Sequence, residues 1–360
     1  MLIRYGSSKS GKRTEIARIY TVDEHGITRD KIDQDARSIT TRLVAAGHQA
    51  YVVGGAVRDL LIGKQPKDFD VATDAHPRKV RKLFRNARII GKRFRLVHVE
   101  IGGAIIEVST FRSLDGENSF GTLEEDVQRR DFTMNALYYS PDKEQIVDYV
   151  GGYADVRAGR VRELLPLETM FVEDPVRMVR AVKYSAGIGF TLSPKLKSRI
   201  RKNSGELSRC SPSRMTEEVL KILQSGSSAA IFDASLKLGL LPYMLQAVSE
   251  KIDRNRDSAE QFFSSMAQLD AEIRGTEVVP RSLLLVAVAD PFMTVVDPGG
   301  GDRTAFYKEV FSGLKETIKP ITPPNNDVHE AVKALLLKRG INPPPKPRRR
   351  RRGRKPGTAT

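Results

Sequence analysis

The sequence predicts an α/β domain followed by a mostly helical part and a disordered basic end. Three observations support this division. Short strand-like and helix-like segments alternate up to about residue 155, helical periodicity prevails beyond it, and the last 20 residues are rich in Pro and Arg. The chain has 360 residues, 40% of them hydrophobic, so it can form more than one domain with a buried core. Global disorder is therefore excluded.

The α/β part is predicted from short segments taken in order. Apolar residues at positions 36, 39, 43 and 46 have helical spacing, and Gly47 ends that helix. The next segments are expected as a strand at 50–53, a helix at 57–61, a strand at 69–72, a helix at 76–84, and a hairpin of 95–101 and 105–110 around Gly102 and Gly103. We expect a small mixed sheet with flanking helices.

Helical patterns fill the second half, for example at 175–186, 212–223 and 230–240. The expected divisions are a flexible N-terminal extension at 1–30, the α/β head at 31–155, a helical neck at 156–228, a helical body at 229–340 and a disordered Arg-rich tail at 341–360.

The charge points to an anionic polymer as partner. The 60 Lys and Arg residues exceed the 44 Asp and Glu residues by 16, and eight of the cations lie in the last 20 residues, which contain no acid. Nucleic acid is favoured over a membrane, because no amphipathic apolar face accompanies the basic tract and the apolar run at 283–289 is too short to span a bilayer. A basic surface that only maintains solubility is the alternative.

The sequence is typical of a cytoplasmic protein. The first residues, MLIRYGSSKS, contain no apolar signal-peptide block, so secretion is not expected. Cys210 is the single cysteine, which excludes an internal disulfide and fits a reducing compartment. The segment 6–12 is close to a P-loop, but Arg13 stands where Ser or Thr would hold the metal, so we expect a mobile basic arm there.

Two adjacent glycines follow the strand at 50–53. Gly54 and Gly55 allow a phosphate to approach the backbone closely and place amide groups at the start of the next helix. Arg58 lies in the first turns of that helix, where it can reach the same anion. The sequence therefore predicts a phosphate site at this turn.

Asp68 and Asp70 are two apart on a predicted strand, so both side chains point to one face. Two carboxylates so close repel each other unless a cation lies between them, and Mg²⁺ prefers such oxygen ligands together with substrate phosphates. A solvated edge strand with a salt-bridged Asp is the alternative for an isolated pair. The preceding strand, glycine pair and helix favour phosphoryl transfer.

These residues resemble the head of the class II nucleotidyltransferases of the polymerase-β-like superfamily, which comprise tRNA CCA-adding enzymes and bacterial poly(A) polymerases. Three further blocks resemble that family in the same order, at 106–112, 124–136 and 173–181. The resemblance covers about residues 45 to 225. It implies a nucleotidyltransferase head followed by a helical neck that binds the nucleotide base and RNA, and a body that binds RNA.

The resemblance also implies roles for individual residues. Asp68 and Asp70 are expected to be catalytic and to hold two Mg²⁺ ions (Mn²⁺ is possible), with Asp131 as a supporting catalytic carboxylate. The nucleotide, ATP, is expected to contact Gly54, Gly55 and Arg58 through its triphosphate, Arg130 through its sugar-phosphate, and Asp174, Arg177 and Arg180 through its base, with Asn135 also in the nucleotide site.

The block around Arg130 has more than one interpretation from its residues alone. Asp131 either adds a third carboxylate to the metal site or orients Arg130, and Glu107, on a strand face, competes for the third-carboxylate role. An ion-pair cluster that closes the domain is the structural alternative.

Asp174 and Pro175 have the pattern of a helix N-cap followed by Pro at the first helical position. In the resembled family this Asp accepts from the exocyclic amine of the base and the following Arg, here Arg177, donates to the adjacent ring nitrogen. Adenine and cytosine both present that pattern, whereas uracil and guanine reverse it. Asp174 and Arg177 are therefore expected to reject UTP and GTP, but these two residues do not distinguish ATP from CTP.

The segment at 89–99 resembles a stretch characteristic of bacterial poly(A) polymerases. The implied activity is the template-independent transfer of AMP from ATP to the 3′ ends of mRNA or other transcripts, with release of pyrophosphate. A CCA-adding enzyme that acts on tRNA is the alternative, and a catalytically inactive RNA-binding protein is the third hypothesis. No membrane partner is expected, and the oligomeric state is not predicted.

Overall fold

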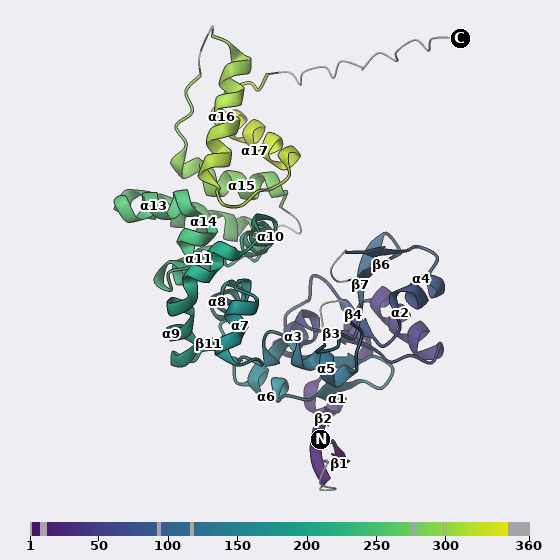
Figure 1. Cartoon of the computed structure of the whole chain (residues 1–360). Helices are drawn as coiled ribbons and strands as arrows, with labels where there is room; N and C mark the ends of the chain where they lie inside the picture. Colours follow the sequence, from purple (N-terminus) through teal and green to yellow (C-terminus); the bar gives the residue numbers. More distant parts are fainter. Residues whose placement is uncertain are drawn as a thin grey trace, which may run out of the picture. The chain divides into compact units, whose positions relative to one another are not determined.

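The computed structural model describes residues 2–7, 13–91, 95–115, 119–275, 279–297, 299 and 301–344. The chain divides into two compact units, Met1–Arg209 and Cys210–Thr360 (Figure 1). The boundaries predicted at 155/156 and 228/229 differ from this division and remain predictions about function. The Arg-rich tail lies almost wholly outside the described residues, as do Lys12, Lys92 and Arg93.

The first unit contains the mixed sheet that the sequence predicts. Its strands lie in the order β1-β2-β9-β8-β3-β4-β7-β6-β5. Strands β4 and β7 are parallel, and the other pairs described in this sheet are antiparallel. The bounds are β1 Leu2–Ser7, β2 Arg13–Tyr20, β3 Ala50–Val53, β4 Asp70–Thr73, β5 Ala87–Ile90, β6 Leu96–Ile101, β7 Ala104–Thr110, β8 Leu137–Ser140 and β9 Gln145–Asp148.

Three strands and two helices of the first unit confirm the predicted pattern closely. The strand at 50–53 is β3, the hairpin is β6 with β7, and the two short helices are α3 (Gly55–Leu61) and α4 (Pro77–Leu83). The Nδ1 atom of His76 accepts the backbone N–H of Arg78 and caps α4, whose first residue is Pro77. Strand β4 begins at Asp70, one residue later than predicted.

The expectation that residues 1–30 form a flexible extension is wrong for the described part. Strand β2 pairs with β9 through Arg18 and Asp148, and α1 (Val22–His25) follows it. The ring of Tyr20 stacks on that of Tyr153 with centroids 4.0 Å apart. The segment was missed because β2 lies near the edge of the sheet and is only half-buried, so it lacks a strong apolar alternation.

Both faces of the central strands are covered. Val53 and Ala72 pack in a core cluster with Leu123 and Val127 of α5 (Leu123–Gln128). Val52 points to the opposite face and is also fully buried. Helix α2 (Gln34–Ala45) packs against β3, β4 and β7. The short strands β5, β8 and β9 were not predicted, because a four-residue apolar run carries too little pattern.

The rest of the first unit is mainly helical, as expected. It contains η2 (Thr133–Asn135), α6 (Gly152–Arg157), α7 (Leu167–Glu173), α8 (Val176–Ile188), α9 (Pro194–Asn203) and η3 (Ser204–Arg209), with the small parallel pair β10 (Arg160–Val161) and β11 (Thr191–Leu192). The carboxylate of Asp148 accepts backbone N–H groups from Val150 to Tyr153 and so fixes the start of α6.

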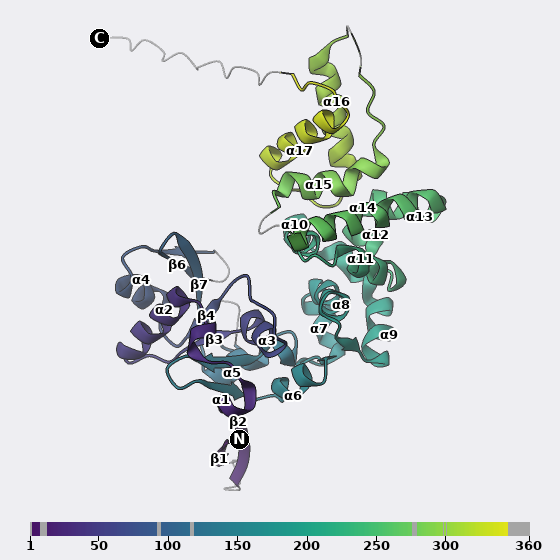
Figure 2. The same cartoon turned by 180° about the vertical axis from the view of Figure 1, so that it is seen from behind.

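The described residues of the second unit form helices and connecting loops, without a strand. Its helices are α10 (Pro212–Leu223), α11 (Ser228–Lys237), α12 (Leu241–Met244), α13 (Gln246–Arg254), α14 (Arg256–Gly275), α15 (Arg281–Ala289), η4 (Asp290–Phe292), α16 (Arg303–Thr317) and α17 (Asn325–Lys338). Helices α15, α16 and α17 pack together, as Figure 2 shows from behind. In the described part of the chain, no helix has the length and apolarity needed to cross a membrane.

Replacing Gly152 by Ala is expected to destabilise the first unit. A Cβ atom at Gly152 would lie 2.1 Å from the backbone oxygen of Thr133, so α6 and η2 would have to separate. Overpacking of this kind costs about 1–3 kcal/mol, which urea unfolding followed by circular dichroism would measure. Gly275→Ala is the matched control, because a Cβ there meets nothing within 4 Å. Equal midpoints for the two variants would contradict the expected clash.

Candidate active site

The glycine turn after β3 lies beside two guanidinium groups. Gly54 has a φ of +70°, a conformation that favours glycine, and α3 begins at the next residue. A Cβ on Gly54 would lie 3.7 Å from Nη1 of Arg130, and one on Gly55 would lie 3.6 Å from Nη2 of Arg58. The structure therefore brings together the four residues that the sequence assigned to phosphate binding.

The two aspartates lie at the same end of the sheet as this turn. Val53 pairs with Asp70 in the β3–β4 register, so Asp70 is directly across from the residue that precedes Gly54. Asp68 and Asp70 are exposed, whereas Phe69 between them is buried, as the predicted alternation requires. Asp68 itself precedes the strand.

Glu107 lies on the strand next to Asp70. Val71 pairs with Val108 in the parallel β4–β7 register, so Asp70 and Glu107, one residue earlier on each strand, leave the same face of the sheet. The Oε1 atom of Glu107 is 3.2 Å from Nε2 of His98. Across the described ranges, no three Asp, Glu, His or Cys side chains gather closely enough to form a metal site by themselves.

Asp131 is buried away from solvent and holds an arginine. Its Oδ2 atom is 3.0 Å from Nη2 of Arg180, and its Oδ1 atom accepts from Nδ2 of Asn135 and from the backbone N–H of Phe132. Burial by itself raises the pKa of Asp131, but Arg180 and these hydrogen bonds outweigh it and hold the pKa below its ordinary value.

These contacts form a closed chain between the sheet domain and α8. Nη1 of Arg58 donates to Oδ1 of Asn135 over 2.7 Å, and Asn135 binds Asp131, which holds Arg180. Nη2 of Arg180 donates to the hydroxyl of Tyr184, whose ring carries the Arg58 guanidinium at 4.7 Å. Asn135, predicted to contact the nucleotide, therefore also links two binding residues.

A second buried acid orients Arg130. The Oδ2 atom of Asp126 accepts from Nη2 of Arg130 over 2.9 Å and from the hydroxyl of Tyr138. Burial raises the pKa of Asp126, but Arg130 and Tyr138 outweigh it and lower the pKa. Arg129 turns away and donates to the backbone oxygen of Ser113. The two neighbouring arginines thus have separate surroundings.

Asp174 and Arg177 lie together at the start of α8. Nε of Arg177 is 3.7 Å from Oδ2 of Asp174, and its Nη1 atom donates to the backbone oxygen of Met170. The helix begins at Val176, its N-cap is Pro175, and no side chain caps it. The N-cap role expected for the Asp174 side chain is therefore wrong, because Asp174 ends α7 instead.

Sequence reasoning did not single out Asp126, Tyr138 or Tyr184 as parts of the site. The i, i+4 spacing of Asp126 and Arg130 carried a usable signal for an ion pair. Tyr184 carried a similar signal, because Arg180, which donates to its hydroxyl, lies four residues earlier on α8. Tyr138 carried none, because only the fold brings it to Asp126.

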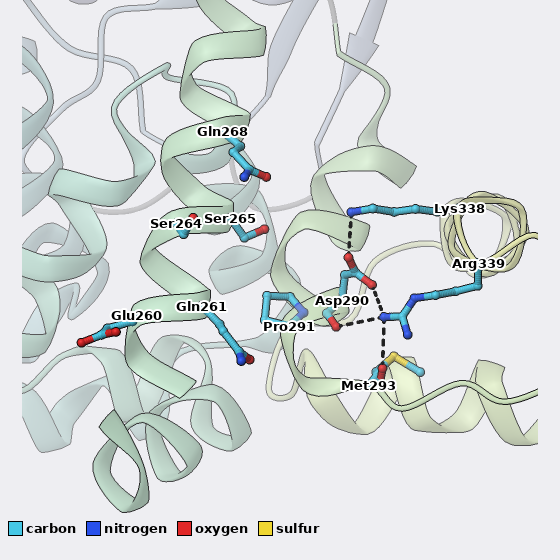
Figure 3. A pocket seen from close by; sticks show the side chains of 10 residues that line it. All are labelled: Glu260, Gln261, Ser264, Ser265, Gln268, Asp290, Pro291, Met293, Lys338 and Arg339. Atoms are coloured by element: carbon cyan, nitrogen blue, oxygen red, sulfur yellow. Dashed lines mark hydrogen bonds and ion pairs between the residues drawn. The ribbon is translucent and has the colours of Figure 1, made fainter. Parts of the chain in front are cut away.

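The second unit has an open groove of about 580 Å³ that contains none of the predicted site residues (Figure 3). Asp290 lies between Lys338 and Arg339 there, opposite polar side chains of α14. Burial raises the pKa of Asp290, but hydrogen bonds from Lys338 and Arg339 outweigh it and lower the pKa. This cluster joins η4 to the end of α17 and needs no ligand to explain it.

Asp131→Asn is expected to lower stability in a pH-dependent way. Because the folded pKa of Asp131 is depressed, its stabilisation is present above the unfolded pKa of about 3.9 and is lost as the pH falls through the folded value. Breaking this buried pair is expected to cost about 3 kcal/mol at pH 7. Urea unfolding at pH 7 and at several lower pH values would measure it.

The matched control is Asp233→Asn, which removes an exposed partner of Lys237 and should cost less than about 1 kcal/mol. A variant at Asp131 as stable as the parent at pH 7 would show that the pair contributes nothing net.

Comparison with known proteins agrees with this arrangement. Residues 50–162 match the family described as the poly A polymerase head domain, and residues 189–252 match one described as the probable RNA and SrmB-binding site of polymerase A. Poly(A) polymerase I of Salmonella typhi is 43% identical over 256 residues, covering 66% of this chain and 55% of that protein. The CCA-adding enzyme of Bacillus subtilis is 38% identical over 208 residues, covering 55% and 52%.

The chain thus spans about half the length of the curated relatives it matches. Among solved structures, the CCA-adding enzyme of Bacillus stearothermophilus in complex with CTP is similar with a TM-score of 0.58 and 27% identity, covering 86% of this chain and 83% of that one. Over the parts that these matches cover, the chain is similar to the nucleotidyltransferases that include bacterial poly(A) polymerases and CCA-adding enzymes.

Proposed function

We propose that this protein adds AMP from ATP to RNA 3′ ends without a template. The 3′-hydroxyl attacks the α-phosphorus, the bond to the β-phosphate oxygen breaks, and pyrophosphate leaves. The observation that supports this most directly is the β3–β4 register, which places Asp70 across from Val53, next to the glycine turn flanked by Arg58 and Arg130. Carboxylates and phosphate-binding cations then share one end of the sheet.

The triphosphate is assigned to the glycine turn. Arg58 and Arg130 supply fixed positive charge there, and each is oriented by a buried network rather than left free to move. The proton from the attacking hydroxyl needs an acceptor, and the exposed carboxylates of Asp68 and Asp70 lie at the same end of the sheet as the turn.

Asp68 and Asp70 would hold magnesium. Their exposure and oxygen donors fit this ion, which takes one or two carboxylates and completes its ligands with substrate phosphates and water. When bound, it supplies charge neutralisation at the triphosphate and favours the ionised hydroxyl.

Of the two candidates for the third carboxylate, we favour Glu107. It leaves the same face as Asp70 from the neighbouring strand, whereas Asp131 is buried against Arg180 and Asn135. Asp131 is then a positioning residue: it holds Arg180 and, through Asn135, the guanidinium of Arg58.

Asp174 and Arg177 would read the base. A carboxylate beside a guanidinium, 3.7 Å apart and both largely buried, offers an acceptor next to a donor, which matches adenine and cytosine. The choice of ATP is supported by the relatives: the 43% match is to a poly(A) polymerase and the 38% match to a CCA-adding enzyme. RNA in the cytoplasm is the proposed acceptor, and the match at 189–252 supports RNA binding.

Asp70→Ala is expected to abolish transfer while the protein stays folded. The carboxylate is exposed, so its removal leaves no buried group unsatisfied. ATP binding should weaken only in part, because Arg58 and Arg130 remain. Single-turnover transfer to a labelled RNA and ATP titration by calorimetry would measure the two effects. Near-normal transfer would refute the assignment of Asp70, and Lys237→Ala provides an exposed control far from the turn in sequence.

Varying both the nucleotide and the RNA acceptor tests whether the protein is a poly(A) polymerase or a CCA-adding enzyme. The full chain is given Mg²⁺ with ATP or CTP, and either an unstructured RNA or a tRNA that lacks its terminal CCA. Long products from ATP on both acceptors, with little from CTP, are expected. Addition of two C residues to the tRNA alone would show a CCA-adding enzyme instead.

A further inference from the structure

Helix α4 and the start of β5 present a dense, purely basic surface outside the proposed active site. Residues 75–99 contain nine Lys and Arg residues and no acid. Seven of these cations are described and exposed, and six of them lie on α4 or between it and the end of β5: Arg78, Lys79, Arg81, Lys82, Arg85 and Arg88. Pro77 and Val80 bury the opposite side of the helix. We call these six residues the α4 basic surface.

These cations have no acidic partner within the described residues. Neighbouring acids are engaged elsewhere: Oδ1 of Asp74 contacts His48 and the backbone N–H of Gln49, and Glu107 contacts His98. Glu100 lies beside Asn86, but no ion pair joins it to a cation of the surface. The positive charge is therefore not neutralised internally, unlike that of Arg130 or Arg180.

Helix α2 adds one more cation to this surface. The guanidinium of Arg42 lies 5.1 Å from the ring centroid of Phe84, the residue that ends α4. Arg42 is itself exposed. On α4, Arg78, Arg81 and Lys82 have i, i+3, i+4 spacing, so they project on one side within about 6 Å along the helix axis.

The cations of α4 are separated from the proposed catalytic end by the length of β4, and Arg88 on β5 lies three strands away from Asp70 in the order β4-β7-β6-β5. Strand β4 begins at Asp70 and ends at Thr73, and α4 starts shortly after that far end. In Figures 1 and 2, α4 lies on the outer side of the head, with β3 and β4 between it and α3. Its cations do not belong to the nucleotide site.

We infer that the α4 basic surface binds the phosphodiester backbone of the acceptor RNA upstream of its 3′ end. This rests on the proposed function, which brings a long polyanion to the head. All six residues of the surface are Lys or Arg, so contacts to phosphates through charge are expected rather than recognition of sequence. An apolar face that would insert into a membrane is lacking as well, since the apolar side of α4 is buried.

The test compares two triple variants of the full chain. Arg78→Gln/Arg81→Gln/Lys82→Gln removes three cations of the surface, and Lys31→Gln/Lys64→Gln/Lys143→Gln removes three exposed cations of the head that lie outside this surface. Binding of a hexanucleotide and of an RNA of about 30 nucleotides is measured by fluorescence anisotropy between about 50 and 200 mM salt, without ATP or Mg²⁺.

For the longer RNA, the first variant should lower the slope of log K against log salt by about 2, since each lost phosphate contact contributes about 0.7. The control should keep the parent slope, and AMP transfer to the hexanucleotide should be unchanged in both. Equal slopes for the variant and the parent, or equal losses in variant and control, would overturn the inference.

Two other polyanions test whether the surface binds a different class of partner. If the first variant loses binding to polyglutamate or to phosphatidylserine vesicles but keeps the parent RNA slope, the surface serves an acidic protein or a membrane, and the inference is wrong. A reduced RNA slope in a protein that transfers no AMP would sustain the inference and refute the proposed function.

Discussion

The arrangement of the first unit depends on the buried contact between Asp131 and Arg180. An ionised carboxylate without solvent is costly, and it is tolerated here because a guanidinium, an amide and a backbone N–H all bind it. Since Arg180 belongs to α8 and Asn135 reaches Arg58 of α3, one buried acid connects the sheet domain to the helix that carries Arg177.

Two groups of arginines in this protein differ in their burial and in their acidic partners. Arg58, Arg130 and Arg180 lie in buried networks with fixed geometry, which suits groups that must meet a triphosphate or hold a neighbour without reorganising. The arginines of α4 are exposed and lack acidic partners in the described chain, which suits loose, salt-dependent contact with a polymer. The proposed purposes of the two groups differ because the surroundings of the arginines differ.

The sequence predicted the head well where strong local patterns coincide. Strand β3, the helix after Gly54, the capped helix α4 and the hairpin around Gly102 each carry a local signal that the fold preserves. It failed at β2, β8 and β9, whose strands are short or half-exposed and are defined by their partners in the sheet. The N-terminal segment was missed for that reason.

In the candidate site, too, local sequence patterns predicted some features, and tertiary packing decided the others. By itself the sequence was enough to predict that Gly54, Asp68, Asp70 and Arg58 belong to one phosphate-handling motif, because residue type and spacing along the chain indicate that chemistry. Only the tertiary structure decided that Asp131 faces Arg180 while Glu107 leaves the sheet beside Asp70. Strand register and burial set those neighbours, and both arise from packing between segments far apart in the chain, which no local pattern encodes.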